Sequence, residues 1–102
     1  MSIEEIMKAN AEAGFFFFSA GAMRFFNSRV SSYTRGRFFI TSERLDMEFP
    51  RLYSVRYLDE KGSVATINDF QEYATLEQAK RALDNAYIEQ LEECHEATIE
   101  KA

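Results

Sequence analysis

The spacing of apolar residues predicts that the chain begins with a short amphipathic helix. Ser2 and Glu5 have the spacing of a capping box, in which each side chain accepts a hydrogen bond from the other residue's backbone amide. We predict a helix over residues 3–13, ended by Gly14, because glycine readily takes the left-handed conformation that follows a helix. The apolar face of this helix is thin, so the helix depends on packing against the rest of the protein.

From Phe15 onward the pattern becomes aromatic, as in β-strands. Aromatic residues dominate 15–19 and 23–29, with Gly21 between them, and predict two short strands or one bent strand. The run Phe15 to Phe18 fits a strand buried on both faces or, alternatively, an aromatic anchor for a partner. Residues 30–36 are rich in serine, and we predict a loop there.

Three later segments have regular strand patterns. Residues 37–42, 51–58 and 63–68 contain β-branched and aromatic residues in alternation. Asp59-Glu60-Lys61-Gly62 separates the last two segments and is typical of a hairpin turn with glycine at the left-handed position. Residues 43–50 are predicted to be irregular or a short helical turn that ends at Pro50.

A long amphipathic helix is predicted at the end of the chain. Thr75 and Gln78 have the spacing of a second capping box, and the helical pattern continues to about Glu100. One apolar stripe at helical spacing consists of Leu76, Ala79, Leu83, Ala86, Tyr87, Leu91, Cys94 and Thr98. Such a helix is about 37 Å long, whereas a six-residue strand spans only about 20 Å. Its second half should extend past the sheet, where it frays, packs on the N-terminal helix or meets a partner.

Together these elements predict one α+β domain over residues 1–102. A short N-terminal helix lies within 1–14, and an antiparallel sheet of four to five strands lies within 15–70. The long helix over 75–100 packs on one face of that sheet.

Charge is distributed unevenly along this chain. The net charge is -5, yet residues 24–56 carry seven arginines against three acids, and residues 57–102 carry eleven acids against four bases. Arginine suits planar, bidentate or stacked contacts. Regular alternation gives the sheet two faces. The face toward the long helix would carry Phe25, Phe38, Ile40, Tyr53, Val55, Tyr57, Ala65 and Ile67. The opposite face would carry Arg24, Phe26, Arg37, Phe39, Thr41, Ser54 and Arg56.

Two surfaces are therefore candidates for binding. One is the arginine–aromatic sheet face, with Arg24, Phe26, Arg37, Phe39 and Arg56. The other is an acidic ridge on the C-terminal helix, with Glu89, Glu92 and Glu96. The plainer alternatives are that the arginines pair with carboxylates of the same molecule and that the glutamates form a solvated helix face.

The composition argues against most catalytic and metal chemistry. One cysteine and one histidine leave no intrachain disulfide, no His pair and no Cys-based zinc site. Cys94 and His95 are adjacent on a helix and point about 100° apart, so they do not form a catalytic pair. The chain has no phosphate-binding glycine loop and no Ser/His/Asp set. We expect a protein that is not an enzyme and binds no cofactor or metal.

The sequence also bears on location and on nucleic acids. No apolar run reaches the roughly 18 residues of a membrane helix, and glutamates precede Phe15 where a signal peptide needs positive charge. We expect a cytoplasmic protein. Residues 35–42 match an RNA-recognition strand motif only in part, and the acidic helix would repel phosphates. Direct nucleic-acid binding is therefore disfavoured.

Four segments carry a resemblance to a known family. They are Met23-Arg24-Phe25-Phe26-Asn27-Ser28-Arg29, Phe39-Ile40-Thr41-Ser42-Glu43, Pro50-Arg51-Leu52-Tyr53-Ser54-Val55-Arg56, and Phe70 through Tyr73-Ala74-Thr75 with Ala79. Across about residues 14–82 the chain resembles a small domain family of unknown function encoded largely by phages, plasmids and their bacterial hosts. This resemblance implies an accessory protein of mobile elements and no particular reaction.

Two classes of function follow as hypotheses. The first is a non-enzymatic accessory protein that inhibits a host protein or protein–nucleic-acid complex, by analogy with anti-defence proteins such as anti-CRISPR inhibitors. It would use the acidic helix or the arginine–aromatic face, and a homodimer through the C-terminal helix is compatible with it. The alternative is a binder of a nucleotide or other small anion, or of nucleic acid, through the arginine–aromatic face.

Overall fold

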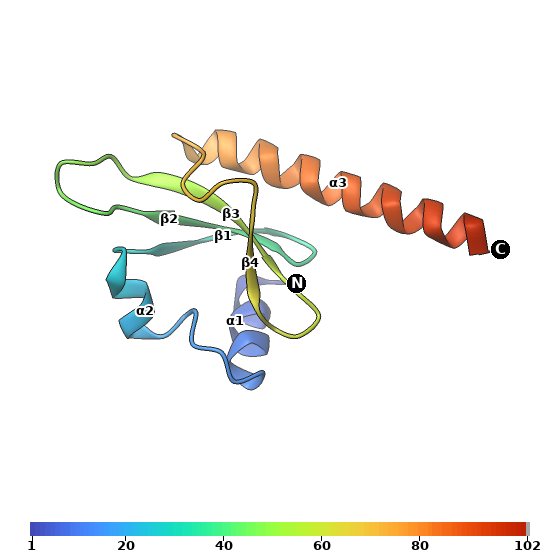
Figure 1. Cartoon of the computed structure of the whole chain (residues 1–102), viewed down its shortest axis with the longest axis horizontal. Helices are drawn as coiled ribbons and strands as arrows, with labels where there is room; N and C mark the ends of the chain where they lie inside the picture. The colour runs from blue at the N-terminus through green and yellow to red at the C-terminus, as the bar shows by residue number, and fades with distance from the viewer. Residues whose placement is uncertain (102) are drawn as a thin grey trace.

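The structure is a computed structural model that describes the backbone of residues 1–101 and the side chains of residues 1–93. A four-stranded antiparallel sheet lies between one long helix and two short helices (Figure 1). The elements are α1 (Ile3–Glu12), α2 (Ala20–Phe25), β1 (Arg29–Arg35), β2 (Phe38–Glu43), β3 (Leu52–Leu58), β4 (Val64–Ile67) and α3 (Leu76–Lys101). The strands lie in the order β1-β2-β3-β4. The predicted α+β class is confirmed.

Local signals in the sequence explain both ends of α1. The Ser2 hydroxyl accepts a hydrogen bond from the Glu5 amide at 3.2 Å, and the Glu5 carboxylate accepts one from the Ser2 amide at 3.0 Å. This backbone hydrogen bond holds the pKa of Glu5 below its usual value. Gly14 follows the helix with φ of 89°, and the Phe15 amide donates to the Asn10 carbonyl at 3.1 Å. The predicted helix and its glycine stop are confirmed.

The prediction of strands across 15–29 is wrong. Phe15 to Phe18 form turns, and Phe16 is 78 % exposed rather than buried on two faces. Ser19 caps α2 by accepting a hydrogen bond from the Ala22 amide at 3.2 Å. Asn27 ends α2 with φ of 48°, and the next amide donates back to the Met23 carbonyl at 2.7 Å. Caps at both ends therefore override the strand preference of the phenylalanines.

The loop predicted for residues 30–36 is wrong as well, because this segment belongs to β1. Strand β1 pairs with β2, with Val30 opposite Thr41 and Thr34 opposite Phe39. Three residues of β1 thus face one residue of β2, which is a bulge. The serine-rich composition suggested a loop, but the segment forms an edge strand of the sheet.

The alternation predicted for β2 and β3 is confirmed, but both faces of the sheet are covered. Under α3 lies a core of Phe38, Ile40, Val55, Ala79 and Leu83. Under α1 lies a second core of Ile6, Phe39 and Leu58. The face expected to be open for binding is therefore closed at its centre, and Phe39, Thr41 and Ser54 are completely buried.

Helix α3 extends past the sheet, as its length predicts. Its 26 residues span about 39 Å, against about 23 Å for the seven residues of β3. Figure 1 shows its C-terminal half leaving the sheet on the opposite side from α1, so the two helices do not pack together. Leu91 is 51 % exposed, and Cys94 and Thr98 lie beyond the described side chains.

A buried ion pair joins β2 to β3 on the α1 side of the sheet. Glu43 is 1 % exposed, and its carboxylate lies 3.3 Å from the Arg56 guanidinium. Ser54 donates to the other carboxylate oxygen at 2.9 Å. Gln71 closes the site by donating its backbone amide to the Ser54 hydroxyl at 2.8 Å and its side chain to the Glu43 carbonyl at 2.8 Å. The carboxylate is therefore both paired and hydrogen-bonded, as a buried charge requires.

Arg56 is held on every side. Its Nε donates to the Thr41 hydroxyl at 2.9 Å, and its Nη1 donates to the Thr66 hydroxyl at 2.5 Å. The guanidinium lies between the rings of Phe17 and Phe70, 5.4 and 5.2 Å from their centroids. Arg56 therefore ties three strands, the turn before α2 and the segment after β4 into one unit.

Replacing Arg56 with methionine is expected to lower the free energy of unfolding by about 3–5 kcal/mol, because Glu43 would stay buried without its cation. Arg35→Met is the control, since Arg35 pairs with Asp84 at 3.4 Å but keeps 40 % of its side chain exposed. There we expect a loss of about 1 kcal/mol or less. Urea denaturation measures both values. Equal losses of unfolding free energy in the two variants would show that the buried Glu43–Arg56 pair stabilises the fold no more than the surface Arg35–Asp84 pair.

Candidate functional site

Four arginines surround a cavity of about 570 Å³ at the end of the sheet where α2 meets the β2–β3 loop. Arg24 comes from α2 and Arg29 from the start of β1, while Arg44 and Arg51 stand on the two sides of the loop. The other lining residues are Ala20, Met23, Asn27, Ser28, Asp46 and Met47. We call this site the arginine cavity. Figure 1 shows α2 and the β2–β3 loop at the same end of the sheet, away from the C-terminal end of α3.

The turn at Asn27 brings these elements together. Its left-handed backbone reverses the chain between α2 and β1, so that Arg24 and Arg29 border the same space. The Arg44 amide donates to the Phe26 carbonyl at 3.0 Å, and the Asn27 side chain donates to the Arg44 carbonyl at 3.1 Å. The loop is thus fastened to the turn by two hydrogen bonds.

Two of the arginines are fixed by backbone carbonyls. Arg51 donates to the carbonyls of Asn27 and Ser42 at 2.9 and 3.0 Å. Arg44 donates to two carbonyls of its own loop, at 3.1 and 2.8 Å. These contacts satisfy N–H groups but leave the positive charges uncompensated. Arg24 and Arg29 form no side-chain hydrogen bond with any of residues 1–93, so their guanidinium groups are available to a ligand.

The arginine cavity keeps a net positive charge, because none of its arginines forms a salt bridge with a carboxylate among residues 1–93. The salt bridges among residues 1–93 are Lys8–Glu12, Arg35–Asp84, Arg56–Glu43 and Lys80–Glu77, and none of them involves the cavity. Asp46 lines the cavity and accepts a hydrogen bond from the Met47 amide, so one negative charge stands against the four positive charges. Burial, and next the charge of Arg29, lower the pKa of Arg51; Arg44 acts in the same direction, whereas Tyr53 and Glu43 act in the opposite one. Arginines clustered around one cavity are typical of a site for an anion.

A second cavity lies on the other side of α2. Its volume is about 680 Å³, and its lining is mostly apolar and includes four phenylalanines. The lining residues are Phe17, Gly21, Ala22, Met23, Phe25, Phe26, Ser28, Arg56, Thr66 and Phe70. We call this site the aromatic cavity. Met23 and Ser28 line both cavities, so the two adjoin.

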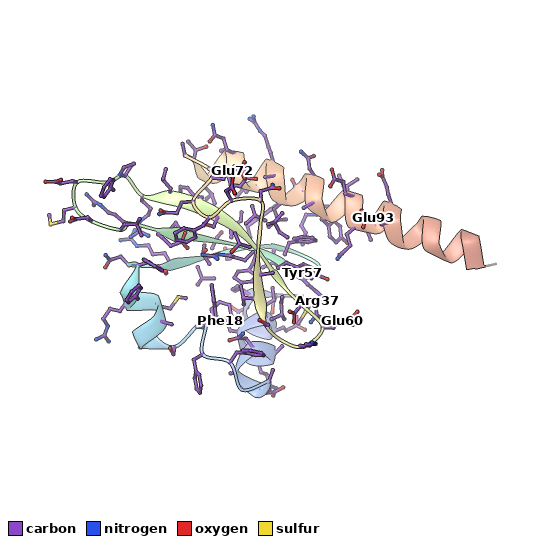
Figure 2. All side chains as sticks on the ribbon, in the orientation of Figure 1. Phe18, Arg37, Tyr57, Glu60, Glu72 and Glu93 are labelled. Atoms are coloured by element: carbon purple, nitrogen blue, oxygen red, sulfur yellow. The ribbon has the colours of Figure 1, made fainter. Side chains whose placement is uncertain are left out.

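The predicted arginine–aromatic residues do not form one surface. Arg24 lines the arginine cavity, and Phe26 and Arg56 line the aromatic cavity. Phe39 is in the core beneath α1. Arg37 lies at the opposite end of the sheet, beside Glu60 in Figure 2, and donates to the carbonyls of Leu58 and Asp59 at 2.6 and 2.7 Å. The prediction that these five residues share one face of the sheet is therefore wrong.

The acidic residues of α3 lie far from the arginine cavity. Glu89, Glu92 and Glu93 are exposed on the part of α3 that leaves the sheet, and Figure 2 shows Glu93 there. The predicted site residue Glu96 lies outside the described side chains. The molecule measures 54 × 30 × 19 Å, and the arginine cavity lies toward one end of it while the C-terminal half of α3 extends toward the other (Figure 1).

Sequence reasoning missed Arg29, Arg44 and Arg51 as members of one site. It identified the arginine-rich segment but placed the working residues by strand alternation. The usable signal was different: Arg24 and Arg29 flank one turn, and Arg44 and Arg51 flank another. Arginines on both sides of two loops can converge without sharing a strand face.

A family model covers most of these elements. It is described as a family of unknown function, DUF7447, and it matches residues 2–84. The chain belongs to this family. No curated protein and no solved structure matches it. The part matched by the DUF7447 model contains both cavities, whereas Glu89, Glu92 and Glu93 lie beyond it.

Among the residues that the structure describes, no group of three or more Cys, His, Asp or Glu is arranged to hold a metal ion. In that same part of the chain, no helix combines the length and the apolar character needed to cross a bilayer.

Removing one cation from the arginine cavity is expected to stabilise the free protein. Arg29→Gln should raise the Tm by about 2–4 °C at low ionic strength, because it relieves repulsion with Arg51. Salt at about 0.5 M should shrink the gain by screening. Arg81→Gln, at an exposed position of α3, is the control and should show no gain. Thermal unfolding followed by circular dichroism measures the difference in Tm between each variant and the unmodified protein. A lower Tm for Arg29→Gln would contradict the claim that the arginines of the cavity repel one another.

Proposed function

We propose that this DUF7447 protein is a non-enzymatic binding protein that takes a small phosphate-bearing anion in the arginine cavity. One observation carries the proposal: four arginines line a single cavity, and none of them pairs with a carboxylate among residues 1–93. Keeping like charges together costs stability, and a bound anion offsets that cost.

The arrangement of the four arginines suits a phosphate group. Arg44 and Arg51 are rigid because backbone carbonyls hold them, so they supply fixed positive potential. Arg24 and Arg29 can each donate two parallel N–H groups to phosphate oxygens. The cavity volume of about 570 Å³ falls in the range of small-molecule sites, roughly 300–1,000 Å³. The net charge of -5 disfavours an extended polyanion, whose phosphates would also approach the acidic parts of the surface.

Pyrophosphate is the probe that tests this function. Isothermal titration calorimetry at low ionic strength should detect binding to the full chain, and affinity should fall as salt is added. Arg24→Gln and Arg29→Gln should each weaken binding about tenfold or more, because each removes charge-assisted hydrogen bonds. Arg81→Gln removes the same charge from α3 and should leave the affinity unchanged. Absence of pyrophosphate binding by the unmodified protein would refute the proposal.

A second candidate function rests on α3. Its glutamates Glu89, Glu92 and Glu93 are exposed on the same part of the helix as Ile88 and Leu91, which are 45 and 51 % exposed. An acidic, partly apolar projection suits a basic groove on a partner. The resemblance of the sequence to mobile-element proteins supports the same idea: an accessory protein of phages or plasmids that inhibits a host defence or nucleic-acid-handling complex in the cytoplasm.

This second candidate has a separate test. A pull-down from bacterial host lysate should recover a protein complex, and Glu89→Lys/Glu92→Lys should abolish the recovery by reversing the charge of the projection. Glu12→Lys/Glu60→Lys makes the same change in net charge at exposed positions elsewhere and should leave recovery intact. Recovery that survives the α3 reversal would remove α3 as the binding surface.

A further inference from the structure

We infer that the ligand of the arginine cavity is a free nucleotide whose base occupies the neighbouring aromatic cavity. This inference rests on the proposed function, because it assigns the phosphate to the arginine cavity. It adds a second half to the site and a chemical class to the ligand. The structural basis is that the two cavities lie on opposite sides of α2 and share Met23 and Ser28.

Helix α2 has two chemically different sides. Ala20 and Arg24 line the arginine cavity, whereas Gly21 and Phe25 line the aromatic cavity. A six-residue helix thus separates a cationic space from an apolar one. A ligand that crosses this ridge must carry an anionic group and an apolar group a short distance apart. A phosphate joined to a planar ring through a sugar has this form.

The aromatic cavity presents rings that the protein itself leaves partly uncovered. Phe25 is 77 % exposed, Phe26 is 38 % exposed and Phe70 is 41 % exposed. Phe26 contacts Phe70 with centroids 5.6 Å apart, and Phe25 contacts Phe26 edge-to-face at 4.6 Å. Exposed, clustered phenylalanines are unfavourable in water, and a planar base would cover them by stacking.

Arg56 gives the aromatic cavity a rigid wall. Its guanidinium is already bound to Glu43, Thr41 and Thr66, and it stacks between Phe17 and Phe70. Arg56 therefore holds the rings of Phe17 and Phe70 in place. Its positive charge is paired with the Glu43 carboxylate and does not serve a phosphate. The apolar cavity and the cationic cavity thus keep separate roles, as a nucleotide with a neutral base and a charged phosphate requires.

The observations favour a free nucleotide over a nucleic-acid chain. The cationic lining and the apolar lining each belong to a single cavity, and the cluster of four arginines lies at one end of the sheet. Beyond that end the chain is acidic, with an excess of seven negative charges in residues 57–102. Further phosphates of a polynucleotide would find repulsion rather than a continuous basic track.

Gly21 allows the aromatic cavity to be filled without disturbing the fold. A Cβ atom added at Gly21 would meet no atom within 4 Å, and α2 tolerates a better helix former there. Gly21→Leu should therefore place its side chain in the aromatic cavity and leave the arginines in position. Asn85→Leu places the same side chain on the exposed surface of α3 and is the control.

Calorimetric titration of the full chain with four probes tests the inference. Adenosine monophosphate should bind about tenfold or more tighter than ribose 5-phosphate, because only the former can stack a base. Adenosine without phosphate should bind far more weakly than either, and pyrophosphate should bind as proposed above. A single-stranded adenine oligonucleotide should bind no tighter per site than adenosine monophosphate.

The variants separate the two halves of the site. Gly21→Leu should reduce adenosine monophosphate affinity to that of ribose 5-phosphate and leave pyrophosphate affinity unchanged, whereas Asn85→Leu should change neither. Phe26→Leu, which keeps an apolar side chain but removes a stacking ring, should also lower the preference for the base. Equal affinities for the nucleotide and the sugar phosphate, no effect of Gly21→Leu on the nucleotide, or tighter oligonucleotide binding would overturn the inference. Loss of pyrophosphate binding altogether would instead refute the proposed function beneath it.

Discussion

The buried pair of Glu43 and Arg56 is the interaction on which the rest of the molecule depends. It lies where β2, β3 and β4 meet the segments before α2 and after β4, and each of its polar atoms is used within the protein. The pair holds the phenylalanines on both sides of the Arg56 guanidinium in place. With Arg56 paired to Glu43, the four arginines at the end of the sheet remain as a cluster without a salt bridge among residues 1–93.

This division of charge connects the fold to its proposed use. Arg56, through its salt bridge with Glu43, and Arg37, through the carbonyls of Leu58 and Asp59, hold the structure together. Arginines that line the cavity without a carboxylate partner among residues 1–93 keep their charge for an external anion. The acidic part of α3 points away from them (Figure 1). Long-range repulsion from the net negative chain therefore acts least at the end where the arginine cavity opens.

Sequence reasoning recovered the elements whose signals are local. The capping box of Ser2 and Glu5, the stop at Gly14 and the hairpin turn ending at Gly62 depend on neighbouring residues, and each forms as predicted. The alternation of side chains between the two faces of β2 and β3 was also predicted correctly, because each strand packs against a core on both faces. The sequence-based prediction was wrong at α2 and β1. There helix caps override the strand preference of phenylalanine, and strand pairing overrides the loop preference of serine.

The composition of the site was visible in the sequence, but its geometry was not. The surplus of arginine in residues 24–56 was evident, whereas the convergence of Arg24 and Arg51 depends on a left-handed Asn27 and on a loop fastened to it. These are contacts between segments about 20 residues apart. The aromatic cavity was missed for the same reason, since it needs α2 to be a helix.

A nuclear magnetic resonance titration of the ¹⁵N-labelled full chain with adenosine monophosphate tests the central claim most directly. The account predicts that the amide signals of residues 20–29 and 44–51 shift most, because these segments line the two cavities. Signals from the exposed face of α3 should stay nearly unchanged. Shifts concentrated in α3 or at the 59–62 turn, or no shifts at millimolar nucleotide, would contradict it.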